Sequence, residues 1–229
     1  MRTLVASALV AAWVLGPASA NAAGVVVTHL EGSAKVQHRK QAFKSLRKGA
    51  KLAEGDRVKT GKKTRLELSF QDGSKVRVGP GADVTIKDAK FDGRRREAVS
   101  LSLRLGQLWA KVARATQGLS RFEVRTANSV AGVRGTSFAV FAAADLSAIV
   151  RVYAGSVGVR SAIGETSTRK QVAGPRQIDK AQYKEILATA LKQVKISKLG
   201  DIAPATDLEP DPEAKAWAKW NQDRDGAAR

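Results

Sequence analysis

The residues of this chain that could support catalysis or metal binding do not fall at the spacings such chemistry needs. The histidines, His29 and His38, are nine residues apart, and there is no cysteine to complete a zinc site with them. Residues 55–63 approach a phosphate-binding loop, but the glycines are one residue too far apart and no Ser or Thr follows Lys62. No G-x-S-x-G nucleophile elbow occurs, although a Ser-His-Asp triad assembled by folding stays open.

Carboxylates offer no clearer catalytic pair. Asp56, Asp72 and Asp83 all lie where turns favour aspartate, because its side chain can bond to the backbone of the turn. We therefore expect a protein that is not an enzyme and that uses no metal or cofactor.

Basic residues are the more informative group. The formal net charge is +19, yet residues 201–229 carry seven acidic and four basic side chains, a net −3. With +1 from Arg2, residues 23–200 carry +21. Three basic clusters stand out, and they are our candidate sites for a polyanion or an acidic partner: Arg39, Lys40, Lys44, Arg47, Lys48 and Lys51; Lys59, Lys62, Lys63 and Arg65; Arg94, Arg95 and Arg96.

Alternation along the predicted strands places further cations on outward positions, where they could align as a charged stripe. They are Lys75, Arg77, Arg104, Lys111, Arg121, Arg125 and Arg151. A solvated face that only keeps the protein soluble would give the same pattern. Trp109, outward by phase beside Lys111, could stack on a sugar or base, or pack under a neighbouring strand or the C-terminal helix.

The N-terminus has the three parts of a secretory signal. Arg2 is followed by an uncharged apolar run over residues 4–15, and small residues around position 20 fit a cleavage site. The run is shorter than the roughly 17–25 residues that span a bilayer, which favours a cleaved signal over an anchor. We assign residues 1–22 to the signal peptide and expect the mature chain in the periplasm, at the cell surface or outside the cell.

Residues 23–160 contain short runs with period-two alternation, separated by turn residues, which indicates one all-β domain. The runs lie at 25–30, 34–37, 65–70, 75–78, 84–86, 101–105, 108–112, 121–125, 138–140, 150–152 and 157–159.

The sequence changes character after Ser161. Residues 161–200 are expected to hold a turn-rich segment and then a helix over residues 181–195, where apolar side chains recur at helical spacing. Residues 201–229 form an acidic, proline-containing linker and a short helix over residues 212–222, with Asp211 as its N-cap. Trp217 and Trp220 share one face of that helix and are expected to dock on the β domain, and the acidic tail could fold back onto the basic body.

An ordered series of turn and strand motifs covers residues 24–160. It runs through Gly55-Asp56, Asp72-Gly73-Ser74, Leu103-Arg104-Leu105-Gly106 and Gly135-Thr136-Ser137-Phe138. In this order the motifs resemble the FecR domain family. Their glycines and aspartates make tight turns and Phe138 points inward, so Gly55, Asp56, Asp72, Gly73, Gly106, Gly135, Thr136 and Phe138 are expected to be structural.

The resemblance implies a twisted, solenoid-like all-β fold outside the cytoplasm. In the family's name-giving members this domain belongs to a membrane-spanning regulator that relays a signal from an outer-membrane receptor to a cytoplasmic sigma factor. We expect no cytoplasmic region or spanning helix here, and therefore a non-enzymatic exported binding module in an envelope sensing or regulatory assembly. The alternative is a basic structural or adhesive surface protein that binds lipopolysaccharide or another anionic polysaccharide, without specific nucleic-acid recognition.

Overall fold

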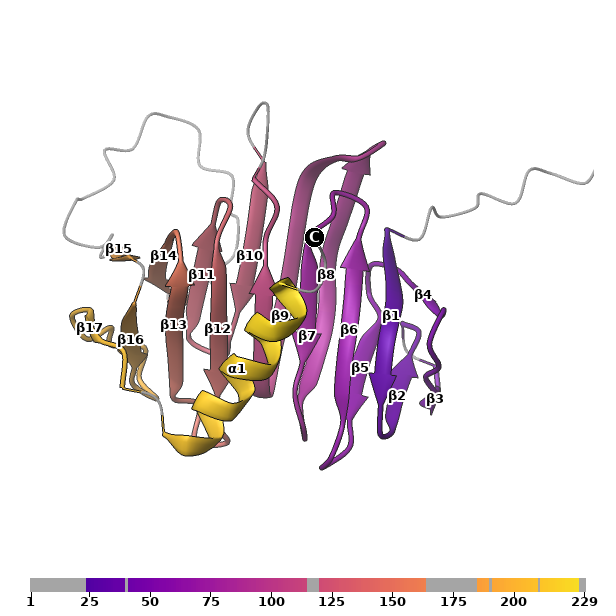
Figure 1. The fold of residues 1–229 in the computed structure, drawn as a ribbon, viewed down its shortest axis with the longest axis horizontal. Coiled ribbons are helices and arrows are strands. Elements are labelled where there is room, and N and C mark those ends of the chain that lie inside the picture. The colour runs from indigo at the N-terminus through magenta and orange to yellow at the C-terminus, as the bar shows by residue number, and fades with distance from the viewer. Residues whose placement is uncertain are drawn as a thin grey trace, which may run out of the picture.

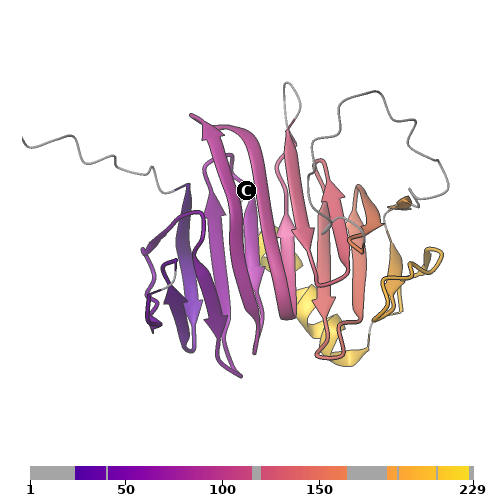
Figure 2. The same ribbon diagram turned by 180° about the vertical axis from the view of Figure 1, so that it is seen from behind.

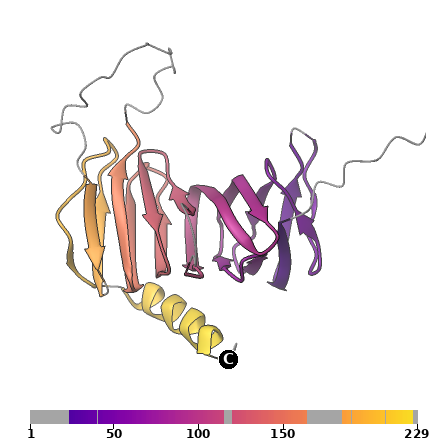
Figure 3. The same cartoon turned by 90° about the horizontal axis from the view of Figure 1, so that it is seen from above.

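The structure, a computed structural model, describes residues 24–39, 41–114, 120–163, 185–189, 191–209 and 211–226. Within them the chain forms seventeen strands and one helix, and the strands join in one hydrogen-bonded network. The network is folded into two layers that face each other, with the helix against the outside of one layer (Figures 1 and 3). We name the layer that carries the helix the front sheet and the other the rear sheet, which Figure 2 shows from behind.

Apart from β4 at the first edge, the front sheet takes its strands in advancing chain order across the molecule. From one edge to the other they are β4 (Lys51–Leu52), β1 (Val25–Glu31), β6 (Arg65–Phe70), β7 (Lys75–Val78), β9 (Arg95–Lys111), β12 (Ser137–Ala142), β13 (Ala148–Ala154), β16 (Lys192–Ile196) and β17 (Thr206–Asp207).

Apart from β3 at the first edge, the rear sheet advances in the same direction. Its strands are β3 (Lys44–Ser45), β2 (Ala34–Gln37), β5 (Arg57–Thr60), β8 (Asp83–Asp92), the first part of β9, β10 (Arg121–Arg125), β11 (Ser129–Val133), β14 (Ser156–Ser161) and β15 (Glu185–Thr189). The described pairings are antiparallel except for the parallel pair of β9 and β10. The all-β prediction is thus confirmed, whereas a solenoid is not, because most neighbouring strands are antiparallel.

Strand β9 belongs to both sheets and crosses between them at Gly106. Leu105 pairs with the rear-sheet residue Asp83, whereas Gly106 pairs with Ala142 in the front sheet. Gly106 has φ of 90°, and a Cβ there would meet the Cα of Ala82 at 2.6 Å. The crossing therefore needs glycine, both for its left-handed backbone and for the close approach of another chain segment.

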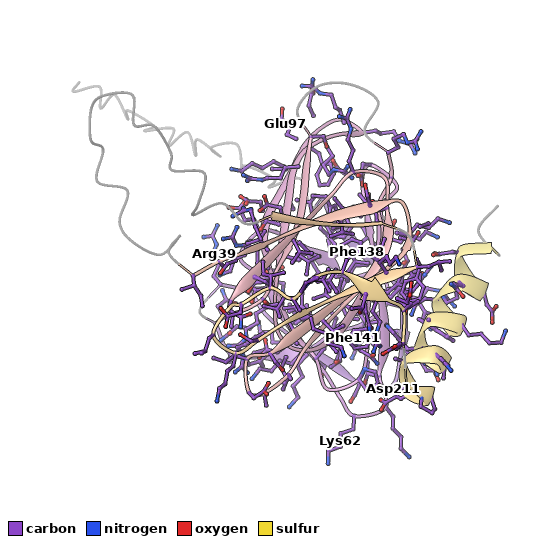
Figure 4. The ribbon with its side chains drawn as sticks, turned by 90° about the vertical axis from the view of Figure 1, so that its left-hand side faces the viewer. Arg39, Lys62, Glu97, Phe138, Phe141 and Asp211 are labelled. Carbon is purple, nitrogen blue, oxygen red and sulfur yellow. The ribbon has the colours of Figure 1, made fainter. Side chains whose placement is uncertain are left out.

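The core fills the space between the two sheets. The inward members of each alternating run, such as Leu68, Leu101 and Val150, are fully buried there. Phe138 is also fully buried and lies in the interior in Figure 4, as the motif analysis predicts. Period-two patterning therefore specifies the core, because successive strand side chains point to opposite faces.

The prediction of a helix over residues 181–195 is wrong. Residues Glu185–Thr189 pair with β14 in the rear sheet, and residues Lys192–Ile196 pair with β13 in the front sheet. Leu191, with φ of 62°, lies in the turn between them. Val194 and Ile196 also fit the alternating pattern of a strand. Backbone pairing of this segment with two open sheet edges outweighs its helical spacing. The sheets thus extend beyond residue 160.

The C-terminal helix α1 (Pro212–Gly226) confirms the second helix prediction and is longer than expected. The Asp211 carboxylate accepts a hydrogen bond of 2.7 Å from the backbone N–H of Ala214, which is the predicted N-cap. In the described part of the chain, no helix has the length and apolar character needed to cross a membrane. The predicted signal peptide, and most of the turn-rich segment after residue 160, lie outside the described residues.

Candidate functional site

The first basic cluster lies at one end of the molecule, on the short edge strands β3 and β4 and the loops around them. We call residues 32–53 the N-terminal cap; it holds seven cations and no acidic residue. Its described cations are exposed, and none has a described carboxylate within 4.0 Å: they are Lys35, Arg39, Lys44, Arg47, Lys48 and Lys51. Lys40 lies outside the described residues. Exposed cations on edge strands also oppose edge-to-edge aggregation. The cations of the N-terminal cap therefore have a structural benefit even without a ligand.

The second cluster is divided by the fold. Lys62 and Lys63 are exposed in the turn before β6, and Lys62 projects from the lower edge of the molecule in Figure 4. The ammonium of Lys59 lies 4.8 Å from the ring centroid of Phe43. Arg65 lies 5.0 Å from the Trp220 ring of α1. Of these four cations, only Lys62 and Lys63 extend fully into solvent.

The third cluster is also divided. Arg94 and Arg95 are exposed at the tip of the β8–β9 hairpin, but Arg96 is buried, with its side chain only 2% exposed. The Arg96 guanidinium forms an ion pair with Asp72 and donates to Ser74 Oγ at 3.0 Å and Ser120 Oγ at 2.9 Å. The prediction that Arg96 belongs to a binding surface is wrong, because this side chain braces the turn at Asp72 from within.

Trp109 is not available to a ligand either, since it is 1% exposed. Its ring packs against Tyr153 in a tilted arrangement with centroids 4.5 Å apart, and its indole N–H donates to Asp225 of α1 at 3.3 Å. Packing under the C-terminal helix, one of the two roles considered for Trp109, is the one observed. Trp217 is buried in one cluster with Trp109 and Ala139 of the β domain, and Trp220 packs against this cluster and stacks on Trp217 at 5.3 Å. The predicted docking of both rings on the β domain is therefore confirmed.

The outer face of the front sheet beneath α1 carries a transverse row of aligned residues. Direct cross-strand pairing joins His29, Glu67, Arg77, Trp109, Ala139, Arg151 and Gln193, one residue from each of seven adjacent strands. Arg77 and Arg151 lie on outward positions, as predicted, but both are buried. Arg77 is covered by α1, which follows it by more than 130 residues, and Arg151 contacts Gln193 and the Phe141 ring.

Arg77 is the third residue of this row and is fully buried. Its guanidinium donates to Glu67 at 2.7 Å, to Asp225 of α1 at 2.8 Å and to the carbonyl of Asn221 at 3.1 Å. Burial disfavours the charge on Glu67, but hydrogen bonds from Arg77 and Thr28 outweigh burial and lower the Glu67 pKa. The predicted return of the acidic tail to the basic body is therefore realised at Asp225.

The rear sheet's outer face is not covered by the helix. There Asp83 is buried and accepts hydrogen bonds from Arg57 at 2.8 Å and from Arg104 at 2.9 Å. Burial opposes the charge on Asp83, yet these arginines together lower its pKa. An open cavity of about 590 Å³ lies nearby, with Arg39 and Lys87 among the residues that line it. On this face the predicted stripe is partly neutralised by carboxylates.

The motif residues have the structural roles expected for them. Asp56 accepts hydrogen bonds from the backbone of Ala53 and pairs with His38, both at 2.9 Å, and Gly55 beside it has φ of 89°. Asp72 caps the turn at Gly73 by accepting from the Ser74 backbone at 3.0 Å.

The glycine–threonine motif is also structural. Gly135 has φ of 67°, and the Thr136 hydroxyl donates to the carbonyl of Ser156 at 2.9 Å. This hydrogen bond ties the segment just before β12 to the start of β14. These motifs build the scaffold.

The two histidines belong to different environments. His38 pairs with Asp56, whereas His29 lies beneath α1, and its pKa is lowered by burial and then by the charge of Arg224. Among the described residues no group of three or more acidic or histidine side chains is placed to hold a metal ion.

Comparison with known proteins agrees with the motif analysis. The family model described as FecR protein matches residues 56–158. This segment is a FecR domain. No curated protein matches the chain significantly.

Two solved structures have a similar fold. They are crystal structures of a "putative anti-sigma factor" from Parabacteroides distasonis ATCC 8503, with TM-scores of 0.52 and 0.51 and 18% sequence identity. Each alignment covers 72% of this chain but only 64% of the solved chain, less than two thirds of its length. The FecR segment spans β5 to β14, so the N-terminal cap, β15–β17 and α1 lie at or beyond its borders.

Proposed function

We propose that this chain is an exported, non-enzymatic FecR-domain module that binds another protein in an envelope sensing or regulatory assembly. The FecR domain and the fold shared with the Parabacteroides distasonis structures support a regulatory role. The signal-peptide pattern of residues 1–22 supports export to the periplasm or the cell surface.

The observation that carries this proposal is how the charged groups are used. Several deeply buried ionisable side chains form internal ion pairs: Arg77 with Glu67, Arg96 with Asp72, and Asp83 with two arginines. Such pairs fix geometry, which gives these side chains a structural role. The remaining charge lies outside, where it can attract and orient a partner.

The N-terminal cap favours a second candidate function, binding of an anionic polymer such as lipopolysaccharide or acidic polysaccharide. Six described, exposed cations without a carboxylate neighbour attract phosphate or uronate groups by long-range electrostatics. Binding of this kind weakens steeply as salt rises, because the Debye length shortens from about 10 Å at 0.1 M to about 3 Å at 1 M.

A pull-down of the tagged mature protein from envelope extract, at 0.1 M and at 0.5 M salt, separates the two functions. A defined protein retained at both salt concentrations supports the sensing or regulatory module. Recovery of only salt-labile anionic polymer contradicts it and supports the alternative.

Charge variants sharpen the comparison. The cap variant Lys44→Gln/Arg47→Gln/Lys48→Gln removes three exposed cations from the N-terminal cap. The control variant Lys195→Gln/Lys198→Gln/Lys219→Gln removes three exposed cations elsewhere. Anionic-polymer binding that falls only in the cap variant assigns it to the cap, whereas an equal fall in both variants indicates a nonspecific effect of net charge.

A further inference from the structure

The interface between α1 and the front sheet is incompletely satisfied. Six buried side-chain polar atoms in the described part of the chain have no hydrogen-bond partner, and all of them belong to α1 or to the face near it. They are His29 Nε2, Arg77 Nη2, Tyr153 OH, Trp217 Nε1, Asn221 Oδ1 and Arg224 Nε. Buried polar atoms are almost always paired in folded proteins, so their concentration in one interface indicates an imperfect fit.

The fit is also incomplete in shape. An open cavity of about 310 Å³ lies beneath the first turn of α1, with Phe141, Ile149 and Ala214 among the residues that line it. The buried side chains of the helix are only Ala214, Trp217, Ala218 and Asn221. The helix therefore occupies part of an aromatic and cationic face without filling it.

The positive charge of the sheet face is not neutralised by α1. Lys75 and Lys111 are direct cross-strand neighbours, and like charges at such positions repel. With Arg77 and Arg151 against Glu67, the outer face carries a net +3, whereas α1 has equal numbers of acidic and basic side chains. An acidic segment would complement this face better than α1 does.

Release of α1 leaves Arg77 with an ion-pair partner in the sheet. Arg77 keeps its direct cross-strand partner Glu67, which is held in turn by Thr28 at 2.7 Å. Arg224 and Asp225, which have opposite charges, leave with α1 and become solvated. Departure of the helix therefore avoids the large penalty of an unpaired buried ion.

From these four observations we infer that α1 is a displaceable occupant of a recognition face on the front sheet. The ligand of that face is an acidic protein segment bearing aromatic side chains. Its carboxylates pair with Arg77 and Lys111, and its rings take the place of Trp217 and Trp220 against Trp109. This inference rests on the proposed protein-binding function and names the surface through which it acts.

The first test measures whether α1 opens independently, by hydrogen exchange of the unmodified mature protein. Opening of α1 alone predicts that its amides exchange about 100-fold or more faster than those of β7 and β12. Equal protection of helix and sheet overturns the inference. This measurement needs no partner, so it stays decisive even if the pull-down recovers no protein.

The second test measures binding at the face, with a fluorescent peptide of residues 211–226 as the probe. Trp217→Ala in the full chain loosens the tethered helix and leaves the face intact, so peptide affinity is expected to rise about tenfold, because the tethered competitor is weakened. Lys219→Ala, at an exposed position of α1, is the matched control and should leave affinity unchanged. No peptide binding to any of these proteins contradicts the inference.

The charge preference is tested with a second peptide that carries Lys215→Glu and Lys219→Glu. Both lysines are exposed on α1, so these changes add acidity without altering the buried side. Tighter binding of the acidic peptide, by about threefold or more at low salt, supports an acidic ligand. Equal or weaker binding overturns that part of the inference.

A locked form provides the third test. Ala139→Cys and Ala218→Cys place two thiols in one buried cluster of a chain that otherwise lacks cysteine. Peptide binding by the reduced form that is lost in the oxidised form supports displacement; equal binding contradicts it. A dimer in the reduced form alone would assign the face to a second copy instead of an acidic partner. If the bond does not form, the exchange measurement decides.

Discussion

Arg95 and Arg96 are adjacent in the chain and lie in opposite environments. The Arg95 side chain is 53% exposed and its nearest carboxylate is 3.3 Å away, whereas the Arg96 side chain is 2% exposed and bonded to Asp72, Ser74 and Ser120. Strand alternation directs one residue into solvent and the next inward. Two adjacent arginines therefore become one surface charge and one internal brace.

This difference predicts unequal costs of substitution. Arg96→Ala leaves Asp72 buried without its partner and is expected to lower the free energy of unfolding by about 3–5 kcal/mol. Arg95→Ala removes only exposed, solvent-screened pairs and should change stability by less than about 0.5 kcal/mol. Urea unfolding of both variants measures the loss of unfolding free energy. Equal losses would show that Arg96 does not brace the turn at Asp72.

The crossing of β9 predicts a steric effect at Gly106. Gly106→Ala combines a left-handed backbone with a contact of 2.6 Å to Ala82, so we expect a loss of about 3 kcal/mol or more. Gly73→Ala has a similar φ of 84° but nothing within 4 Å of its Cβ, so backbone strain alone should cost about 1–2 kcal/mol. Thermal and urea unfolding compare the two, and a Gly106→Ala protein no less stable than Gly73→Ala would contradict the close-approach explanation.

Asp83 predicts a loss of stability in acid. Its pKa in the folded protein lies below the ordinary value near 4, so its stabilising effect is present above about pH 4 and is lost as pH falls through the folded pKa. Asp83→Asn removes both ion pairs and is expected to cost about 1–3 kcal/mol at pH 7. The difference between wild type and variant should shrink below pH 4; a difference independent of pH from 7 to 2.5 would exclude this linkage.

His29 predicts that acid loosens α1. Burial and the charge of Arg224 lower its pKa, so neutral His29 stabilises docking above about pH 6.5, and this contribution falls as pH drops below 6.5 toward the folded pKa. The charged groups around it are Arg224 on α1, Glu67 on β6, Glu31 on β1 and Lys48 in the N-terminal cap.

The measurement is hydrogen exchange of α1 at pH 7.5 and 5.5, corrected for the intrinsic rates. Faster corrected exchange at pH 5.5 is expected in the wild type, together with a smaller change in His29→Gln. Identical pH dependence in the two proteins would assign the effect to another group.

The sequence by itself determined the strands of the FecR segment. Leu66, Leu68 and Phe70 alternate with polar residues, and glycine and aspartate mark the turns at positions 55–56 and 72–73, because period-two burial and turn chemistry are local properties of the chain. The same local reasoning located α1 through Asp211 and Pro212.

Tertiary structure alone decided which cations face solvent. Arg77, Arg96 and Lys59 have the same outward or basic character in sequence as Lys62, yet three are taken up by Glu67, Asp72 and the Phe43 ring. It also turned the helical spacing of residues 186–194 into strands, because open sheet edges offered backbone partners. Contacts made over 70 to 150 residues of chain, such as Arg77 with Asp225, leave no periodic signal in a sequence, so the recognition face beneath α1 emerged only when the chain was folded.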